Sequence, residues 1–240
     1  MGLKEVNITG PKVAFRIFGL NVTETVILSW CVIAVITGLI LFMTHNMSKT
    51  NPSKKQIVAE WIVQIFTNMV KDSMGSINLR YTPYMATIFM FSICGSLISL
   101  LGLRPVTGDY STTLAWALIT FVMIIHAKIK NDGLGGYLIG FTKPIIVLAP
   151  INVISEVATP VSMSIRHFGN IASGIVITQL LYFALTMVSN AIGLDFPIFT
   201  IGVPAVLSVY FDLFTGFMQA FVFTMLTMAN VGSAYPEPEN

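Results

Sequence analysis

Long apolar runs alternate with short polar segments along most of this chain. Three of the runs, 22–44, 81–103 and 110–127, are close to the roughly 20 residues that a helix needs to cross a bilayer. Each run therefore predicts one membrane-spanning helix. The last two spans are joined by 104–109 (RPVTGD), a short Pro- and Gly-containing turn, which predicts that they form a hairpin.

Residues 54–75 have a different pattern, in which apolar side chains recur at helical spacing while charged residues flank or interrupt the stripe. This pattern predicts an amphipathic helix at the membrane interface. The alternative is an ordinary amphipathic helix packed on a soluble domain, but the chain has no soluble domain to receive it. The stripe consists of Ile57, Val58, Trp61, Ile62, Ile65, Phe66, Met69 and Val70.

Two later apolar stretches, 144–192 and 196–231, are longer than one perpendicular span. Each is compatible with two spans or with one long, tilted helix. Glu156 and Arg166 lie near the middle of the first stretch, and two charged residues disfavour a pair of ordinary lipid-facing spans there. We therefore predict two long tilted helices that form a hairpin, although periodicity alone does not decide between the two arrangements.

The complete prediction is an all-α integral membrane protein with a single domain over 1–240. It has five transmembrane helices and one interfacial helix, between an outer segment (1–21) and a cytoplasmic tail (232–240). Composition agrees, because 55% of residues are hydrophobic and only 10% are charged. A net charge of +2 gives no indication of a nucleic-acid partner.

Orientation is predicted from the distribution of positive charge. With the N-terminus outside, the cytoplasmic segments hold eight of the 13 Lys and Arg residues. The expected location is a bacterial plasma membrane, and an organellar inner membrane is the alternative.

Arg166 is the least expected residue, because arginine stays protonated in proteins and a charge at the bilayer midplane costs about 2.5 to more than 10 kcal/mol. Glu156 precedes it by ten residues on the same predicted helix. On the next helix Asp212 precedes Gln219 by seven residues. If Gln219 is placed beside Arg166 in an antiparallel pair, the two carboxylates lie about 25 Å apart on opposite sides of the midplane. That arrangement would separate two half-channels for an ion.

Three other interpretations of these charged residues are less favoured. A buried ion pair between Arg166 and a carboxylate would serve only stability, but such pairs are poor stabilisers. A secondary ion-coupled transporter or channel would use similar residues, yet the sequence shows no repeat. An aspartyl membrane hydrolase would need two carboxylates that meet. His167 is expected to be a partner for a neighbouring polar group or carbonyl.

Three segments together resemble one known family, subunit a of the F-type ATP synthase, the ion-translocating stator of its membrane motor. They are 164–174 (SIRHFGNIASG), 101–114 (LGLRPVTGDYSTTL) and 219–227 (QAFVFTMLT). The resemblance implies that Arg166 matches the essential arginine facing a ring of c subunits, with Asn170 and Gln219 flanking it. It also implies partners, namely the c-ring, the b-subunit stalk and the rest of the F1Fo complex. The chain would not be an enzyme by itself and would need no cofactor or metal.

The same resemblance implies roles for three carboxylates. Asp212 matches an ionisable position in the outer half-channel, Glu156 an acidic position near the inner one, and Asp109 an acidic residue at the outer mouth. Many family members carry a carboxylate or histidine directly after the small residue and glycine that follow the asparagine. Here Gly174 is followed by Ile175. Either Asp212 serves the outer side with hydroxyls and water, or the coupling ion is Na⁺; the proton is the favoured prediction.

Overall fold

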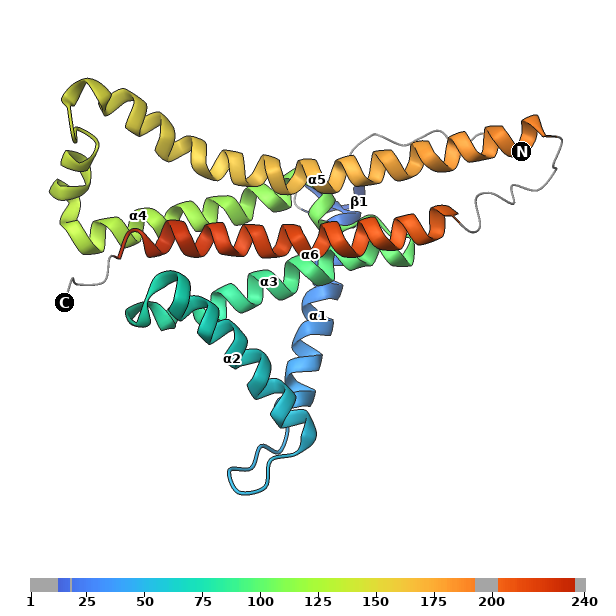
Figure 1. The fold of residues 1–240 in the computed structure, drawn as a ribbon, viewed down its shortest axis with the longest axis horizontal. Coiled ribbons are helices and arrows are strands. Elements are labelled where there is room, and N and C mark those ends of the chain that lie inside the picture. Colours follow the sequence, from blue (N-terminus) through green and yellow to red (C-terminus); the bar gives the residue numbers. More distant parts are fainter. Residues whose placement is uncertain (1–12, 18, 193–202, 236–240) are drawn as a thin grey trace.

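The computed structural model describes residues 13–17, 19–192 and 203–235, and this part of the chain is almost entirely helical (Figure 1). Its one sheet is an antiparallel hairpin of β1 (Val13–Ile17) and β2 (Leu20–Thr23). Five helices among the described residues are long and apolar enough to cross a membrane. The prediction of an all-α, multi-pass membrane protein is therefore confirmed.

α1 (Glu24–Thr44) follows β2 directly and carries no charge after Glu24. Its 21 residues extend about 32 Å, which matches the hydrocarbon core of a bilayer. Most of its large apolar side chains are exposed, and Figure 1 shows the helix running away from α3, α4, α5 and α6 toward the start of α2. A backbone surrounded by lipid must satisfy its polar groups internally, so this run is helical without any packed partner along most of its length.

α2 (Lys54–Met74) begins after Ser53, whose hydroxyl accepts a hydrogen bond from the Gln56 amide at 3.4 Å, and ends at Gly75, where φ is +80°. It is not among the helices with the apolar length to span a membrane. One face is buried against the bundle through Phe66, Val70 and Met74. α2 is therefore amphipathic, as the 54–75 pattern predicted.

The next two helices differ from their predicted bounds. α3 (Thr82–Leu97) is lengthened by 3-10 turns η1 (Ser76–Tyr81) and η2 (Ile98–Leu101). After η3 (Val106–Gly108), α4 (Tyr110–Gly140) continues well beyond the predicted end at residue 127, with a non-helical backbone at Gly133. The prediction ended this helix too early because it took Lys128 and the charges after it as a loop. Charged side chains at the end of a membrane helix do not stop the helix when they find partners.

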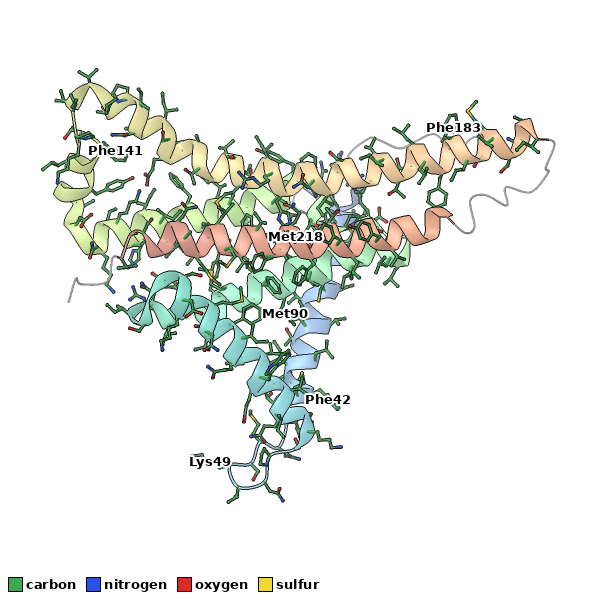
Figure 2. The ribbon with its side chains drawn as sticks, viewed as in Figure 1. Phe42, Lys49, Met90, Phe141, Phe183 and Met218 are labelled. Atoms are coloured by element: carbon green, nitrogen blue, oxygen red, sulfur yellow. The ribbon has the colours of Figure 1, made fainter. Side chains whose placement is uncertain are left out.

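α5 (Ala149–Ala191) follows a 3-10 turn, η4 (Ile146–Leu148), and α6 (Val203–Gly232) returns antiparallel beside it (Figure 1). The 43 residues of α5 extend about 65 Å, twice the hydrocarbon thickness. One helix therefore occupies most of 144–192, and it must tilt or extend past the bilayer. Phe183 lies on the far part of α5, where the helix projects beyond the bundle (Figure 2). The start of the predicted 196–231 helix lies outside the described residues.

The core lies where α2, α3, α4, α5 and α6 meet. A first cluster joins α2, α3, α4 and α6 around Val70, Met85 and Met228. A second joins α3, α4, α5 and α6 around Trp116 and Phe223. Methionine fills irregular gaps between helices because its side chain is unbranched and flexible. The α5–α6 pair is thus anchored on one side and leaves its other side open.

Gly216 marks the tightest approach in this core. A Cβ atom at this position of α6 would lie 2.9 Å from the Cβ of Ser96 on α3. We expect Gly216→Ala to lower the thermal stability of the purified protein, at a cost of about 1–3 kcal/mol, because α6 must move off α3. Gly38→Ala on α1 is the control, since an added Cβ there meets nothing within 4 Å. Equal melting temperatures for the two variants would contradict the prediction.

Candidate ion path

Side-chain contacts define how α5 and α6 align. The His167 ring lies 5.4 Å from the Phe223 ring between centroids, and the Asn230 Nδ2 lies 3.6 Å from the Met163 sulfur. Gln219 is one turn from Phe223, and Arg166 is next to His167 in the chain. Because the two helices are antiparallel, Gln219 is level with a residue about four positions after His167, roughly 8 Å along α5 from Arg166. Its side chain is buried.

Arg166 itself lies on an exposed stripe of α5. Ser162, Arg166, Asn170 and Ser173 are spaced by three or four residues, so they share one helical face, and all four are exposed. A Cβ added at Gly169 beside this stripe meets nothing within 4 Å. Among the described residues the sole ion pair, between Lys128 and Glu156, does not involve Arg166. The arginine thus presents its charge on a surface of small residues.

Glu156 binds Lys128. The Lys128 Nζ lies 2.7 Å from both carboxylate oxygens, and the two side chains are 31% and 15% exposed. The sequence reasoning missed this partner because it placed Lys128 in a loop. Extending the 110–127 helix through its polar end would have put Lys128 on α4, but the pattern does not identify Glu156 as its partner.

This ion pair lines a large cavity of about 550 Å³, which we call the large cavity. It lies at the end of the molecule where α4 turns into α5, marked by Phe141 in Figure 2. The cavity is bounded by α4, the start of α5 and the residues just after α6. Its polar lining consists of Lys128, Asn131, Asp132, Tyr137, Lys143, Asn152, Ser155, Glu156, Thr159 and Ser233.

A second, small cavity of about 20 Å³ lies on the other side of Arg166 along α5. Its volume is enough for one water molecule. The Asp212 carboxylate lines it together with Asn170, Ile175 and the Ser99 side chain. The remaining lining residues are Ser96, Pro105, Ile171, Gly174 and Thr215. One carboxylate, hydroxyls and an amide therefore surround this space.

The two cavities are separated along α5. Glu156 in the large cavity and Asn170 in the small cavity are 14 residues apart, about 21 Å along the helix, and Arg166 lies between them. Glu156 and Asp212 line different cavities, so they do not form the paired site that an aspartyl hydrolase needs. The arrangement has two polar spaces offset on either side of a fixed positive charge.

Asp109 has a structural role that the sequence reasoning did not anticipate. It is the N-cap of α4, where its carboxylate accepts a hydrogen bond from the Ser111 amide at 3.1 Å. The other carboxylate oxygen accepts a bond from the Thr25 hydroxyl at 2.8 Å. Asp109 thereby ties α1 to the start of α4. Its predicted place at an outer mouth stays a prediction.

His167 joins the helices behind the arginine. Its ring is fully buried, lies 5.7 Å from the Trp116 ring between centroids, and its Nε2 is 3.4 Å from the Ser92 hydroxyl. The predicted polar neighbour is therefore Ser92. Packing His167 inward on α3, α4 and α6 turns Arg166, the preceding residue, toward the outside.

Comparison with known proteins gives one consistent result. Residues 26–231 match the family model described as ATP synthase A chain. The chain is similar to "ATP synthase subunit a, sodium ion specific" of Propionigenium modestum, with 30% identity over 95% of this chain and 79% of the relative. It is also similar to ATP synthase subunit a of Moorella thermoacetica (30%, covering 93% and 95%) and to ATP synthase subunit a 1 of Crocosphaera subtropica (33%, covering 89% and 87%).

Proposed function

This chain belongs to the ATP synthase subunit a family, a membrane component of the Fo sector, and from that premise we propose how it carries ions. Arg166 faces a rotating ring of c subunits, and the two cavities beside it are parts of two offset half-channels. The observation that carries the proposal is the exposed Arg166, which forms no ion pair with a described residue and lies between the large and small cavities.

The exposed stripe supports a moving partner at this face. Ser162, Asn170 and Ser173 are small or short polar residues, and small residues let a second helix approach closely in lipid. A ring carboxylate that is neutral in lipid would be held ionised beside the Arg166 guanidinium. It would release its ion into one half-channel and reload from the other. Arg166 would also repel cations and so block direct passage between the cavities.

In this proposal the two cavities open to opposite sides of the membrane. The small cavity, with Asp212, serves the outer side, and the large cavity, with Glu156, serves the cytoplasmic side. Each elementary charge that crosses the full potential gains about 2.3 kcal/mol per 100 mV, and rotation collects several such steps. Further proposed partners are the b-subunit stalk and the rest of the complex, in a bacterial plasma membrane with the N-terminus outside.

We propose the proton as the coupling ion, because a single carboxylate with hydroxyl neighbours and room for one water can relay it. Sodium is the second candidate. It is favoured by the apolar Ile175 in the cavity lining and by the relative from Propionigenium modestum that is described as sodium ion specific. ATP hydrolysis by the purified complex, measured with and without Na⁺, separates the two ions.

Asp212→Asn tests the small cavity. The substitution keeps the side-chain size but removes the group that exchanges the ion, so we expect ATP-driven ion flux to fall at least about tenfold while the complex still assembles. Flux is measured in membrane vesicles, with subunit content checked by purification. Asp72→Asn, on the exposed face of α2, is the matched control and should leave flux unchanged. Unaltered flux in Asp212→Asn would remove Asp212 from the path.

A further inference from the structure

We infer that Lys128 is a positioning residue of the ion path, which holds Glu156 in a neutral pair so that the large cavity passes the coupling cation without retaining it. The inference rests on the proposed function, since it assumes that the large cavity is part of the cytoplasmic half-channel. It assigns to a lysine of α4 a role that acts through a carboxylate of α5.

Lys128 engages both oxygens of the Glu156 carboxylate. Nζ of Lys128 is 2.7 Å from each of the Glu156 oxygens, so both oxygens accept from the same ammonium group. Both side chains are partly buried at 31% and 15% exposure, which strengthens their interaction relative to a surface pair. A passing cation therefore meets a carboxylate whose charge is already balanced.

Charge in the rest of the cavity is balanced as well. Among the described residues that line it, the charged side chains are Lys128, Asp132, Lys143 and Glu156, two of each sign. Tyr137 is the other titratable group in this lining. Removal of Lys128 alone would leave the cavity with a net charge of −1. The cavity would change from a neutral polar space into a cation site.

Glu156 would be well placed to hold a cation once its partner is removed. A partly buried carboxylate without a counter-charge is destabilised by desolvation, and binding a proton or a metal cation relieves that destabilisation. In addition, Pro160 has no N–H, so the main-chain carbonyl of Glu156 lacks its usual helical donor. Hard cations such as Na⁺ prefer oxygen ligands of these two kinds.

The competing interpretation is that the pair only fastens α4 to α5. The two interpretations differ when both charges are removed together. If the pair only holds α4 against α5, removing Lys128 alone and removing both charges should have the same effect. A charge-balancing role is lost only when one partner is removed, because replacing both partners by neutral groups leaves no uncompensated charge.

The experiment compares Lys128→Met with the double variant Lys128→Met/Glu156→Gln in the complete complex. ATP-driven pumping is measured in inverted vesicles against the concentration of H⁺ in sodium-free buffer, and separately of Na⁺ at constant pH, on the face to which the large cavity opens. For whichever of the two ions is pumped, we expect Lys128→Met to lower the half-saturating concentration at least about tenfold and to slow the maximal rate. The double variant should return the half-saturating concentration to within about twofold of wild type.

Lys130→Met is the matched control, because Lys130 is an exposed residue of α4 that does not line the cavity. An unchanged half-saturating concentration in Lys128→Met would overturn the inference, as would a double variant that keeps the shift of the single one. Failure of the wider proposal looks different. Normal pumping by an Arg166 variant would reject the proposed function, whereas normal ion affinity in Lys128→Met with inactive Arg166 variants would reject only the role of Lys128.

Discussion

Arg166→Ala is expected to abolish ATP-driven ion pumping in a complex that still assembles. The substitution removes a charge that no described residue of this chain pairs with, so no ion pair between the described helices is lost. The ring carboxylate, in contrast, loses a charge-assisted interaction of about 3 kcal/mol, which corresponds to at least about a 100-fold fall in rate. Pumping is measured by dye quenching in inverted vesicles, and assembly by co-purification of the ring and the catalytic sector.

Two further variants define what the arginine does. Arg166→Lys keeps the charge but loses the planar fork of donors, so we expect pumping to remain strongly impaired. Arg16→Ala, which removes an exposed arginine of β1, should behave as wild type.

Passive ion conduction through vesicles stripped of the catalytic sector should rise in Arg166→Ala, because the repulsive barrier between the two cavities is gone. Normal pumping in this variant would refute the proposed mechanism.

The helices could be predicted from the sequence to the extent that lipid determines them. The uncharged run of α1 has no alternative to a helix in a membrane, and the prediction for 22–44 differs from Glu24–Thr44 by only two residues at one end. α4 was predicted too short because the contact that accounts for its polar end is made with a residue distant in sequence. Lys128 looks like a loop residue until Glu156, 28 positions later, is brought to within 2.7 Å of it. Local pattern holds no information on that pairing.

The long helix α5 shows a different limit. An apolar stretch of this length permits two spans or one tilted helix, and Pro160 in its interior would favour a break. The structure keeps one helix because contacts hold both sides of the proline in line. Before it, Glu156 pairs with Lys128, and after it, Met163 and His167 pack against neighbouring helices. Those contacts are made by residues on α3, α4 and α6, which hydropathy cannot pair.

The sequence identified which residues belong to the candidate site, but not which groups surround them. Arg166, Glu156 and Asp212 stand out because charge is rare in apolar runs. Spacing along the sequence did not predict their surroundings. Glu156 pairs with the Lys128 ammonium group, Asp212 lines the small cavity with Ser99, and Arg166 pairs with neither carboxylate. Separation of the two carboxylates into different cavities follows from α3 and α4 closing opposite ends of the α5–α6 pair.

Gly169→Trp is expected to stop pumping without unfolding the subunit. Gly169 adjoins Arg166 and Asn170, and a Cβ placed there meets nothing within 4 Å apart from its chain neighbours and the nearby backbone of its own helix. The indole, with about 200 Å² of surface, therefore starts from an open position on α5 and would occupy the space that the proposed ring must enter. We expect ATP-driven pumping to be lost and ring co-purification to be reduced, with the melting temperature of the subunit unchanged.

Gly38→Trp is the matched control for this variant. Gly38 is also an interior helix position at which an added Cβ meets nothing within 4 Å, but it lies on α1, far from the arginine stripe in sequence. Both substitutions replace a helical glycine by the same residue, so their effects on helix propensity cancel in the comparison. If both variants pump normally, the ring does not pass Gly169, and the face carrying Arg166 must be reassigned. If both variants fail, lipid-exposed bulk alone is the cause. Loss in Gly169→Trp alone places the moving partner against α5.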